Sequence, residues 1–103
     1  MKYEIAYSPK AIEDLERVWS EVLKASGDYQ TTEEYIDALM NKVEQKAEFP
    51  KSGSPLYYED LFTGYYYVFY KAYKVFYRVE KDRLLIDGVL YSKSDYLRIL
   101  KLD

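Results

Sequence analysis

The sequence predicts one α+β domain, spanning residues 1–103, in which an N-terminal strand and an antiparallel helical hairpin pack on a mostly antiparallel sheet of three to four strands. Two stretches with helical spacing of apolar residues fill the first half of the chain. Alternating aromatic and β-branched residues fill the second half. A length of 103 residues suits a single domain with a modest core.

The chain begins with a short strand at residues 3–7, followed by a helix. Ser8 is a good N-cap, Pro9 fits the first helical position, and Gly27 is a typical helix stop. An apolar stripe lies between them: Ala11, Ile12, Leu15, Val18, Trp19, Val22 and Leu23. The charged residues are interpreted as the solvated face: Glu13, Asp14, Glu16, Arg17, Glu21 and Lys24.

A second helix is predicted to open at Thr31, because Thr31 and Glu34 have the spacing of a capping box. Phe49-Pro50 closes it, and the few residues between the helices favour an antiparallel hairpin. Its apolar stripe is Tyr35, Ile36, Leu39, Met40, Val43 and Ala47.

Three strands are expected next. Residues 57–70 are extended, with a candidate break at Thr63-Gly64. A tight turn at Lys71-Ala72 leads into a strand at residues 73–79, and a turn at residues 80–82 leads into residues 83–91. Ser94-Asp95 is predicted to cap a last short helical turn.

Composition excludes several classes of function. Hydrophobic residues are 49% and charged residues 32%, as in a soluble globular protein. The chain has no cysteine and no histidine, which excludes disulfides, thiolate chemistry and a Ser-His-Asp triad. No apolar run approaches the roughly 20 residues that span a bilayer, and we see no signal peptide. We therefore expect a cytoplasmic protein without membrane contact, cofactor or metal.

The charge is unevenly distributed along the chain. The net charge is −3, and residues 1–50 carry six Lys and Arg against eleven Asp and Glu. Residues 64–101 carry eight against four. A polyanionic partner would therefore contact the C-terminal half, although the acidic total argues against tight non-specific binding of nucleic acid.

The tyrosine-rich segment of residues 64–79 has two candidate surfaces. In the strand at residues 73–79, the better core face holds Tyr73, Val75, Tyr77 and Val79. The other face presents Lys74, Phe76 and Arg78, which could bind an anion and stack a base, or form an ordinary solvated surface. Residues 65–67 are all tyrosine and cannot all face the core, so we expect at least one of them, such as Tyr66, to be exposed or covered by a partner.

Four segments, in order and nearly end to end, resemble the RelE/ParE superfamily of bacterial type II toxins. Residues 8–15 are similar to the family's S-x-x-A-x-x-D-L helix start. Pro50 and Gly53 match P-x-x-G. Residues 73–79 resemble Y-R-[VI]-x-Y-x-V, and residues 89–96 resemble V-x-H-x-R-x-D-Y. The resemblance implies a growth-inhibiting toxin bound to a cognate antitoxin protein in a hetero-oligomer.

Members of this superfamily either cleave mRNA on the ribosome, without metal, or poison DNA gyrase. In the ribonuclease branch, a central-strand arginine and a C-terminal His, Arg or Tyr surround the scissile phosphate. By resemblance, the candidate catalytic residues here are Lys74, Tyr91 and Lys93. The candidate substrate- or partner-binding residues are Arg78, Tyr96, Phe76 and Tyr66.

Two substitutions depart from the ribonuclease pattern. Lys74 keeps the charge of the family arginine but lacks its planar fork. Tyr91 replaces the usual His or Arg and is a poor base at neutral pH. These departures and the acidic balance favour a gyrase inhibitor over a ribonuclease. An inactive or repurposed member that only binds a partner protein is the third alternative, and none of the three clearly leads.

Overall fold

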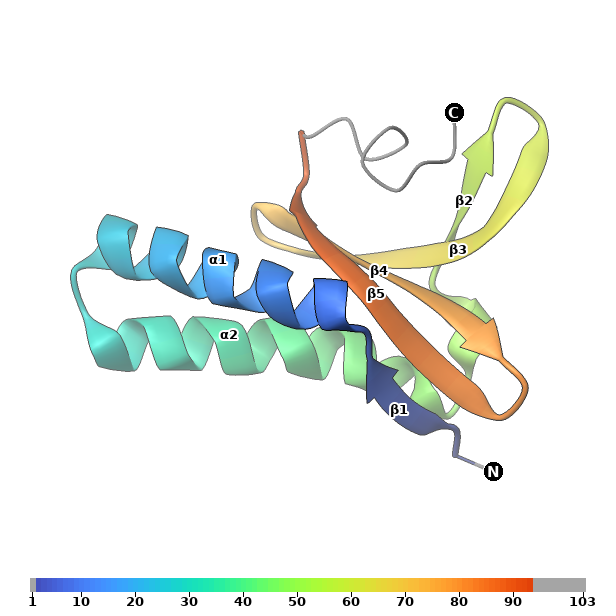
Figure 1. Ribbon diagram of the computed structural model, residues 1–103, viewed down its shortest axis with the longest axis horizontal. Helices are drawn as coiled ribbons and strands as arrows, with labels where there is room; N and C mark the ends of the chain where they lie inside the picture. Colours follow the sequence, from blue (N-terminus) through green and yellow to red (C-terminus); the bar gives the residue numbers. More distant parts are fainter. Residues whose placement is uncertain (1, 94–103) are drawn as a thin grey trace.

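The computed structural model describes residues 2–93, in which two antiparallel helices lie beside a twisted sheet (Figure 1). The strand order is β1-β5-β4-β3-β2, with β1 parallel to β5 and every other neighbouring pair antiparallel. The predicted α+β class is confirmed. The elements are β1 (Glu4–Tyr7), α1 (Pro9–Ser26), α2 (Tyr29–Glu44), the 3₁₀ turns η1 (Gln45–Ala47) and η2 (Pro50–Ser52), β2 (Ser54–Tyr58), β3 (Leu61–Tyr70), β4 (Tyr73–Glu80) and β5 (Arg83–Tyr91).

The predicted ends of α1 are confirmed. Ser8 Oγ accepts a 3.0 Å hydrogen bond from the Ala11 N–H, which is an otherwise unpaired donor of the first turn. Gly27 has φ 68° and donates its N–H to the Leu23 carbonyl at 2.8 Å, as in a left-handed C-terminal cap. Neither helix of the described part is long and apolar enough to cross a bilayer.

The predicted start of α2 at Thr31 is wrong. Asp28 is the N-cap, and its Oδ2 accepts the Thr31 N–H at 2.8 Å, so that Thr31 lies inside the first turn. A carboxylate caps at least as well as a hydroxyl, and the left-handed Gly27 lets the chain reverse directly before Asp28. The helix also ends earlier than predicted, at Glu44, and η1 and η2 carry the chain past Phe49-Pro50.

The predicted break at Thr63-Gly64 is also wrong, because both residues lie inside β3. The chain reverses at Glu59-Asp60 instead, where Glu59 adopts φ 56°. The turns at Lys71 and Lys81, with φ of 50° and 55°, were both predicted, and β4 and β5 have nearly the predicted bounds. The helical turn predicted at Ser94-Asp95 lies outside the described residues.

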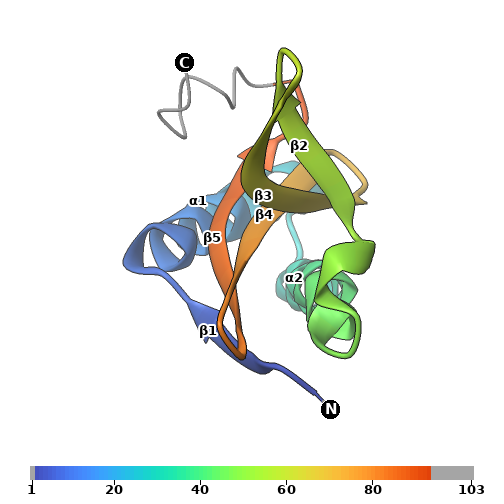
Figure 2. The same ribbon diagram turned by 90° about the vertical axis from the view of Figure 1, so that its right-hand side faces the viewer.

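The two faces of the sheet differ in what covers them. We call the face under α1 and α2 the helix face and the other the second face; Figure 2 shows the β2–β3 hairpin extending past the helices. The prediction for β4 is confirmed, since Tyr73, Val75 and Tyr77 pack in the helix-face core. That core also includes Val18, Val22, Ile36, Leu39, Val43, Val68, Leu84, Ile86 and Val89. Each fully buried apolar side chain stabilises the fold by about 1.5–3 kcal/mol relative to exposure.

The Pro50–Gly53 loop is fastened to this core by one hydroxyl. Tyr77, which is 0% exposed, donates from its Oη to the Pro50 carbonyl at 2.5 Å and accepts the Gly53 N–H at 3.1 Å. A β-carbon on Gly53 would lie 2.2 Å from that oxygen. Glycine at position 53 is therefore required by close approach, which gives the P-x-x-G pattern a structural reason.

Candidate functional site

The second face brings the predicted strand cations together with aromatic rings. Lys74, Phe76 and Arg78 alternate along β4, in register with Phe69, Tyr67 and Tyr65 of β3. Phe76 is fully buried, in a second apolar cluster with Leu56 and Leu90. Both alternatives for this face, a surface that stacks a base and an ordinary solvated surface, place Phe76 in solvent, so the exposure of Phe76 was predicted wrongly.

Lys74 is also buried, with 9% of its surface exposed. Its Nζ lies 4.8 Å from the centroid of the Tyr67 ring and 5.0 Å from that of Phe69. A cation over an aromatic face at this distance is attracted by the ring quadrupole. The lysine charge is therefore held against two rings of β3 instead of extending into solvent.

Arg78 is exposed, and carboxylates lie beside its guanidinium. Arg78 Nε is 3.9 Å from Asp87 Oδ2, and Nη2 is 4.0 Å from Glu80 Oε1. Asp87 Oδ2 also accepts a 2.7 Å hydrogen bond from the Tyr65 hydroxyl. Burial, as the larger cause, and this hydrogen bond together raise the pKa of Tyr65 to about 12. The tyrosine thus remains a neutral donor at physiological pH.

Tyr91 does not join Lys74, because it lies on the opposite side of the sheet. It pairs with Tyr73, and the two rings meet edge to face with centroids 6.1 Å apart. Tyr73 belongs to the helix-face core, and its hydroxyl donates to Glu21 Oε1 of α1 at 2.7 Å. Burial and this hydrogen bond raise the pKa of Tyr73. The structure therefore separates two of the three candidate catalytic residues.

The remaining candidates are dispersed. Lys93 is exposed in the turn after β5. Tyr66 lies on the helix face, where its ring stacks on Tyr77 with centroids 5.6 Å apart. Tyr65 and Tyr67 pack in the second-face cluster, so residues 65–67 alternate between the two faces. None of the three is exposed, and the expected exposure of one of them, such as Tyr66, is therefore wrong. Tyr96 lies outside the described residues.

Asp14 was interpreted as part of a solvated helix face, and this interpretation is wrong. It is 8% exposed, and its Oδ2 accepts the Val89 N–H of β5 at 2.9 Å. Arg17 Nη2 donates to the Val89 carbonyl at 2.7 Å, and Lys10 Nζ lies 2.9 Å from Asp14 Oδ2. The sequence did contain a signal, because Asp14 occupies the helical spacing of the buried residues Ala11, Val18 and Val22. Ile12, predicted for the stripe, is 49% exposed.

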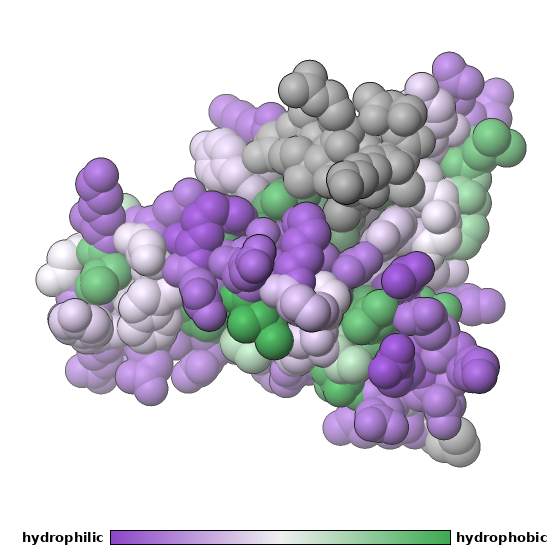
Figure 3. All heavy atoms as spheres, viewed as in Figure 1, coloured by the Kyte–Doolittle hydropathy of each residue, from purple (hydrophilic) through white to green (hydrophobic). Residues whose placement is uncertain are grey.

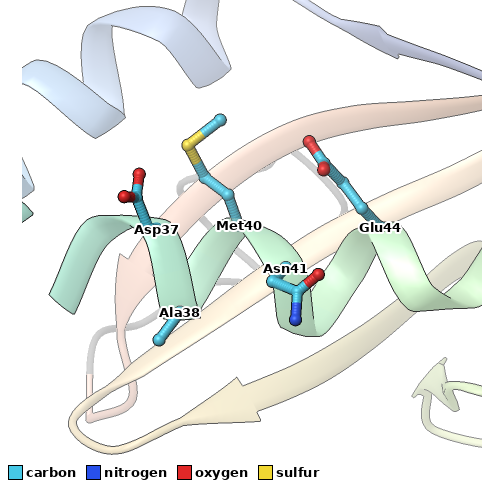
Figure 4. A pocket seen from close by; sticks show the side chains of 5 residues that line it. All are labelled: Asp37, Ala38, Met40, Asn41 and Glu44. Carbon is cyan, nitrogen blue, oxygen red and sulfur yellow. The ribbon is translucent and has the colours of Figure 1, made fainter. Parts of the chain in front are cut away.

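A shallow hollow of about 480 Å³ lies along α2. Asp37, Met40 and Glu44 project from the same side of the helix (Figure 4). Glu44 Oε2 accepts a hydrogen bond from the Tyr7 hydroxyl of β1, so this carboxylate is used in packing. Within residues 2–93, no group of three acidic or imidazole side chains converges to hold a metal ion.

A comparison with models of known protein families identifies the family of this chain. The family model described as ParE toxin of type II toxin–antitoxin system, parDE, matches residues 5–96. The chain belongs to the ParE toxin family. The ParE match covers all the described strands and helices from Ile5 onward, including the Pro50–Gly53 loop and the strand that carries Lys74.

Two solved structures share this ParE-family fold. A chain of the chromosomal ParDE toxin–antitoxin system from P. aeruginosa superposes with a TM-score of 0.73 at 13% identity, covering 87% of this chain and 96% of that one. A chain of the toxin–antitoxin complex RelBE2 from Mycobacterium tuberculosis superposes with a TM-score of 0.62 at 16% identity, covering 91% and 95%. Comparison with curated protein sequences finds no match. At these identities, the two structures establish the fold alone.

Proposed function

We propose that this ParE-family toxin inhibits bacterial growth in the cytoplasm by binding DNA gyrase, without chemistry of its own, and that a cognate antitoxin binds and neutralises it. The observation that carries the proposal is the separation of Lys74 from Tyr91 across the sheet, in a chain that belongs to the ParE family. Cleavage of mRNA by its own 2′-hydroxyl needs a base, an acid and cations around one phosphate. Groups on opposite faces of a sheet cannot contact the same phosphate.

The state of the strand cations supports the same proposal. Negative charge builds on the phosphate oxygens during cleavage, and cations aimed at that charge stabilise it best when they are already in place. Lys74 is buried against Tyr67 and Phe69, and Arg78 has carboxylates of Asp87 and Glu80 within 4.0 Å. To bind a phosphate here, the site would first have to release these contacts.

Metal-independent cleavage of mRNA on the ribosome is the second candidate. One observation favours it, namely that Lys74, Tyr67 and Phe69 place a cation beside two rings, a combination that can hold a nucleotide. In this alternative, Lys74 stabilises the phosphate charge, Lys93 adds a second cation, and Tyr91 reaches the leaving oxygen only after rearrangement.

Inducible expression in a bacterial host tests both candidates. Wild type is compared with Lys74→Ala and Tyr91→Phe, while growth, cellular mRNA and DNA damage are followed together. We expect growth arrest with intact mRNA and induced DNA damage, and purified protein should inhibit supercoiling by gyrase. Arrest with mRNA cleavage that both substitutions abolish would establish the ribonuclease instead. No arrest at good soluble expression would indicate an inactive or repurposed member that acts only by binding a partner protein.

A further inference from the structure

The tip of the β2–β3 hairpin, residues 57–62, exposes large apolar side chains next to two carboxylates. Leu61 is 71% exposed, Tyr57 53% and Phe62 46%. Glu59 and Asp60 form the exposed turn between the two strands. Figure 3 shows hydrophobic residues gathered on this hairpin at the right of the molecule. Tyr57 pairs with Phe62 on one face of the hairpin, and Leu61 pairs with Tyr58 on the other, so the tip exposes apolar side chains on both of its faces around a charged turn. Exposed apolar side chains of this size beside charged residues are typical of a contact surface.

A basic groove lies at the other end of β3. We call it the lysine groove; it is formed by Lys42 of α2, Lys46 of η1, residues 52–54 and residues 67–69, and has a volume of about 230 Å³. Phe69 is 51% exposed at its wall. Within residues 2–93, Lys42 and Lys46 form no ion pair, whereas Lys10, Arg17, Arg78 and Arg83 all do.

The groove and the tip are complementary in size, polarity and charge. Small-molecule sites usually have volumes of about 300 Å³ or more, so this groove better suits a single aliphatic side chain with its neighbours. Lysine stems pack against apolar groups while their ammonium groups pair with carboxylates. The tip offers an exposed leucine, which can fill the groove, and the carboxylates of Glu59 and Asp60, which can pair with its two lysines.

The tip cannot occupy the groove of its own chain. Leu61 and Phe69 lie toward opposite ends of β3, roughly 25 Å apart at the usual rise of a strand. We propose that two copies of this chain form a closed dimer in which each hairpin tip occupies the lysine groove of the other. Because both surfaces lie along the β2–β3 side of the sheet, one two-fold axis can satisfy both contacts and close the assembly. Pro55 in the edge strand β2 disfavours strand addition there, so side chains make the contact.

Charge reversal of the two surfaces tests this dimer directly. The molar mass in solution is measured by light scattering and by sedimentation over about a hundredfold range of concentration. A tip variant carries Glu59→Lys with Asp60→Lys, and a groove variant carries Lys42→Glu with Lys46→Glu. Lysine is compatible with position 59, because Lys71 and Lys81 already adopt the same positive φ in the equivalent turns. We expect each variant alone to be monomeric, with a dimer dissociation constant at least about tenfold higher than that of the wild type.

Mixing the two variants gives the decisive measurement. In an equimolar mixture every tip meets a groove of opposite charge, so a heterodimer should form that neither variant forms alone. The matched control, Lys24→Glu with Lys81→Glu, changes the net charge as the groove variant does and should remain dimeric. Leu61→Ser should also yield a monomer, and thermal unfolding checks that each variant is folded.

The dimer is refuted if the wild type is monomeric over the whole range, or if the mixed variants do not associate. Loss of antitoxin binding in the tip variant, with a monomeric wild type, would assign the surface to the antitoxin and would also refute it. None of these outcomes depends on whether the protein inhibits gyrase, since the measurement uses the isolated chain.

Discussion

The two faces of the sheet are built from the same strands but are stabilised differently. On the helix face, Val75, Leu84 and Ile86 are 0% exposed, and the hydroxyl of Tyr77 is fully hydrogen-bonded. On the second face, apolar burial is concentrated around Phe76, while charged groups such as Arg78 lie at its margin. We infer that the helix face carries most of the folding free energy. The second face has more freedom to carry charges that serve recognition.

The largest expected effect is on the helix face, at Tyr77. Tyr77→Ala should lower the free energy of unfolding by about 3–5 kcal/mol, because it removes a fully buried ring and its two hydrogen bonds. Tyr77→Phe keeps the ring and should cost about 1–3 kcal/mol. Urea unfolding measures both. Equal losses would mean that the hydroxyl, and not ring packing, dominates this side of the sheet.

Gly53→Ala should follow, at about 1–3 kcal/mol, because the new methyl group would lie 2.2 Å from Tyr77 Oη. The cost should fall in a Tyr77→Phe background, where the clashing oxygen is absent. A double-mutant cycle in urea measures this coupling. Strict additivity would show that the loop moves away from Tyr77 without loss.

Asp14→Ala tests whether the helix face also depends on polar contacts. The substitution leaves the Val89 N–H without its carboxylate and should cost about 1–3 kcal/mol in thermal or urea unfolding. The neighbouring Glu13 is exposed, and Glu13→Ala should stay within about 0.5 kcal/mol of the wild type. If Asp14→Ala left the free energy of unfolding unchanged, packing alone would hold α1 against β5.

The pH dependence of stability reports on the second face through Tyr65. Its pKa in the folded protein is about 12, above the ordinary value of about 10, so its contribution is fully present below pH 10 and is lost as the pH rises through 12. Tyr65→Phe should therefore lose less stability than the wild type between about pH 9 and 11.5. Urea unfolding at the two pH values measures the difference, with Tyr29→Phe as an exposed control. Parallel losses in wild type and Tyr65→Phe would mean that burial and the bond to Asp87 do not raise the pKa of Tyr65.

The smallest effect is expected at the margin of the second face. Arg78→Ala removes the ion pairs of an exposed guanidinium at 3.9 and 4.0 Å and should change the free energy of unfolding by only about 0–1 kcal/mol. A loss as large as that of Asp14→Ala would mean that the two faces do not differ as we infer.

Most helices and strands could be predicted because the residues that specify them lie close together in the sequence. The Ser8 cap, the Gly27 stop and the alternation of residues 73–79 all act within a few residues of the chain, and the structure confirms them. The errors came from competing local signals. The N-cap of α2 is Asp28, three residues before the predicted cap at Thr31. The turn between β2 and β3 lies at Glu59-Asp60, although glycine, here Gly64, is the residue type that usually indicates a turn.

The candidate site was less predictable than the fold. Alternation correctly placed Lys74, Phe76 and Arg78 on one face, but it could not show that Lys74 is buried beneath Tyr67 and Phe69. Nor could it show that Tyr91 faces the helices, because that depends on its register with Tyr73 across two strands. The resemblance to the family motifs predicted that Lys74 and Tyr91 belong to one site, whereas the pairing of β4 with β5 puts them on opposite faces of the sheet.

The sequence by itself determined the class of fold, the two helices, the β4 and β5 strands and the family, because periodicity, caps and short motifs are read along the chain. Only the tertiary structure decided the burial of Asp14, the fastening of Gly53 by Tyr77, and the opposite placement of Lys74 and Tyr91. These features join residues 24 to 75 positions apart or depend on strand register. The physical reason is packing between elements. A carboxylate such as that of Asp14 can be buried when a backbone N–H of another element donates to it. The face on which a strand side chain lies depends on the register with the neighbouring strand.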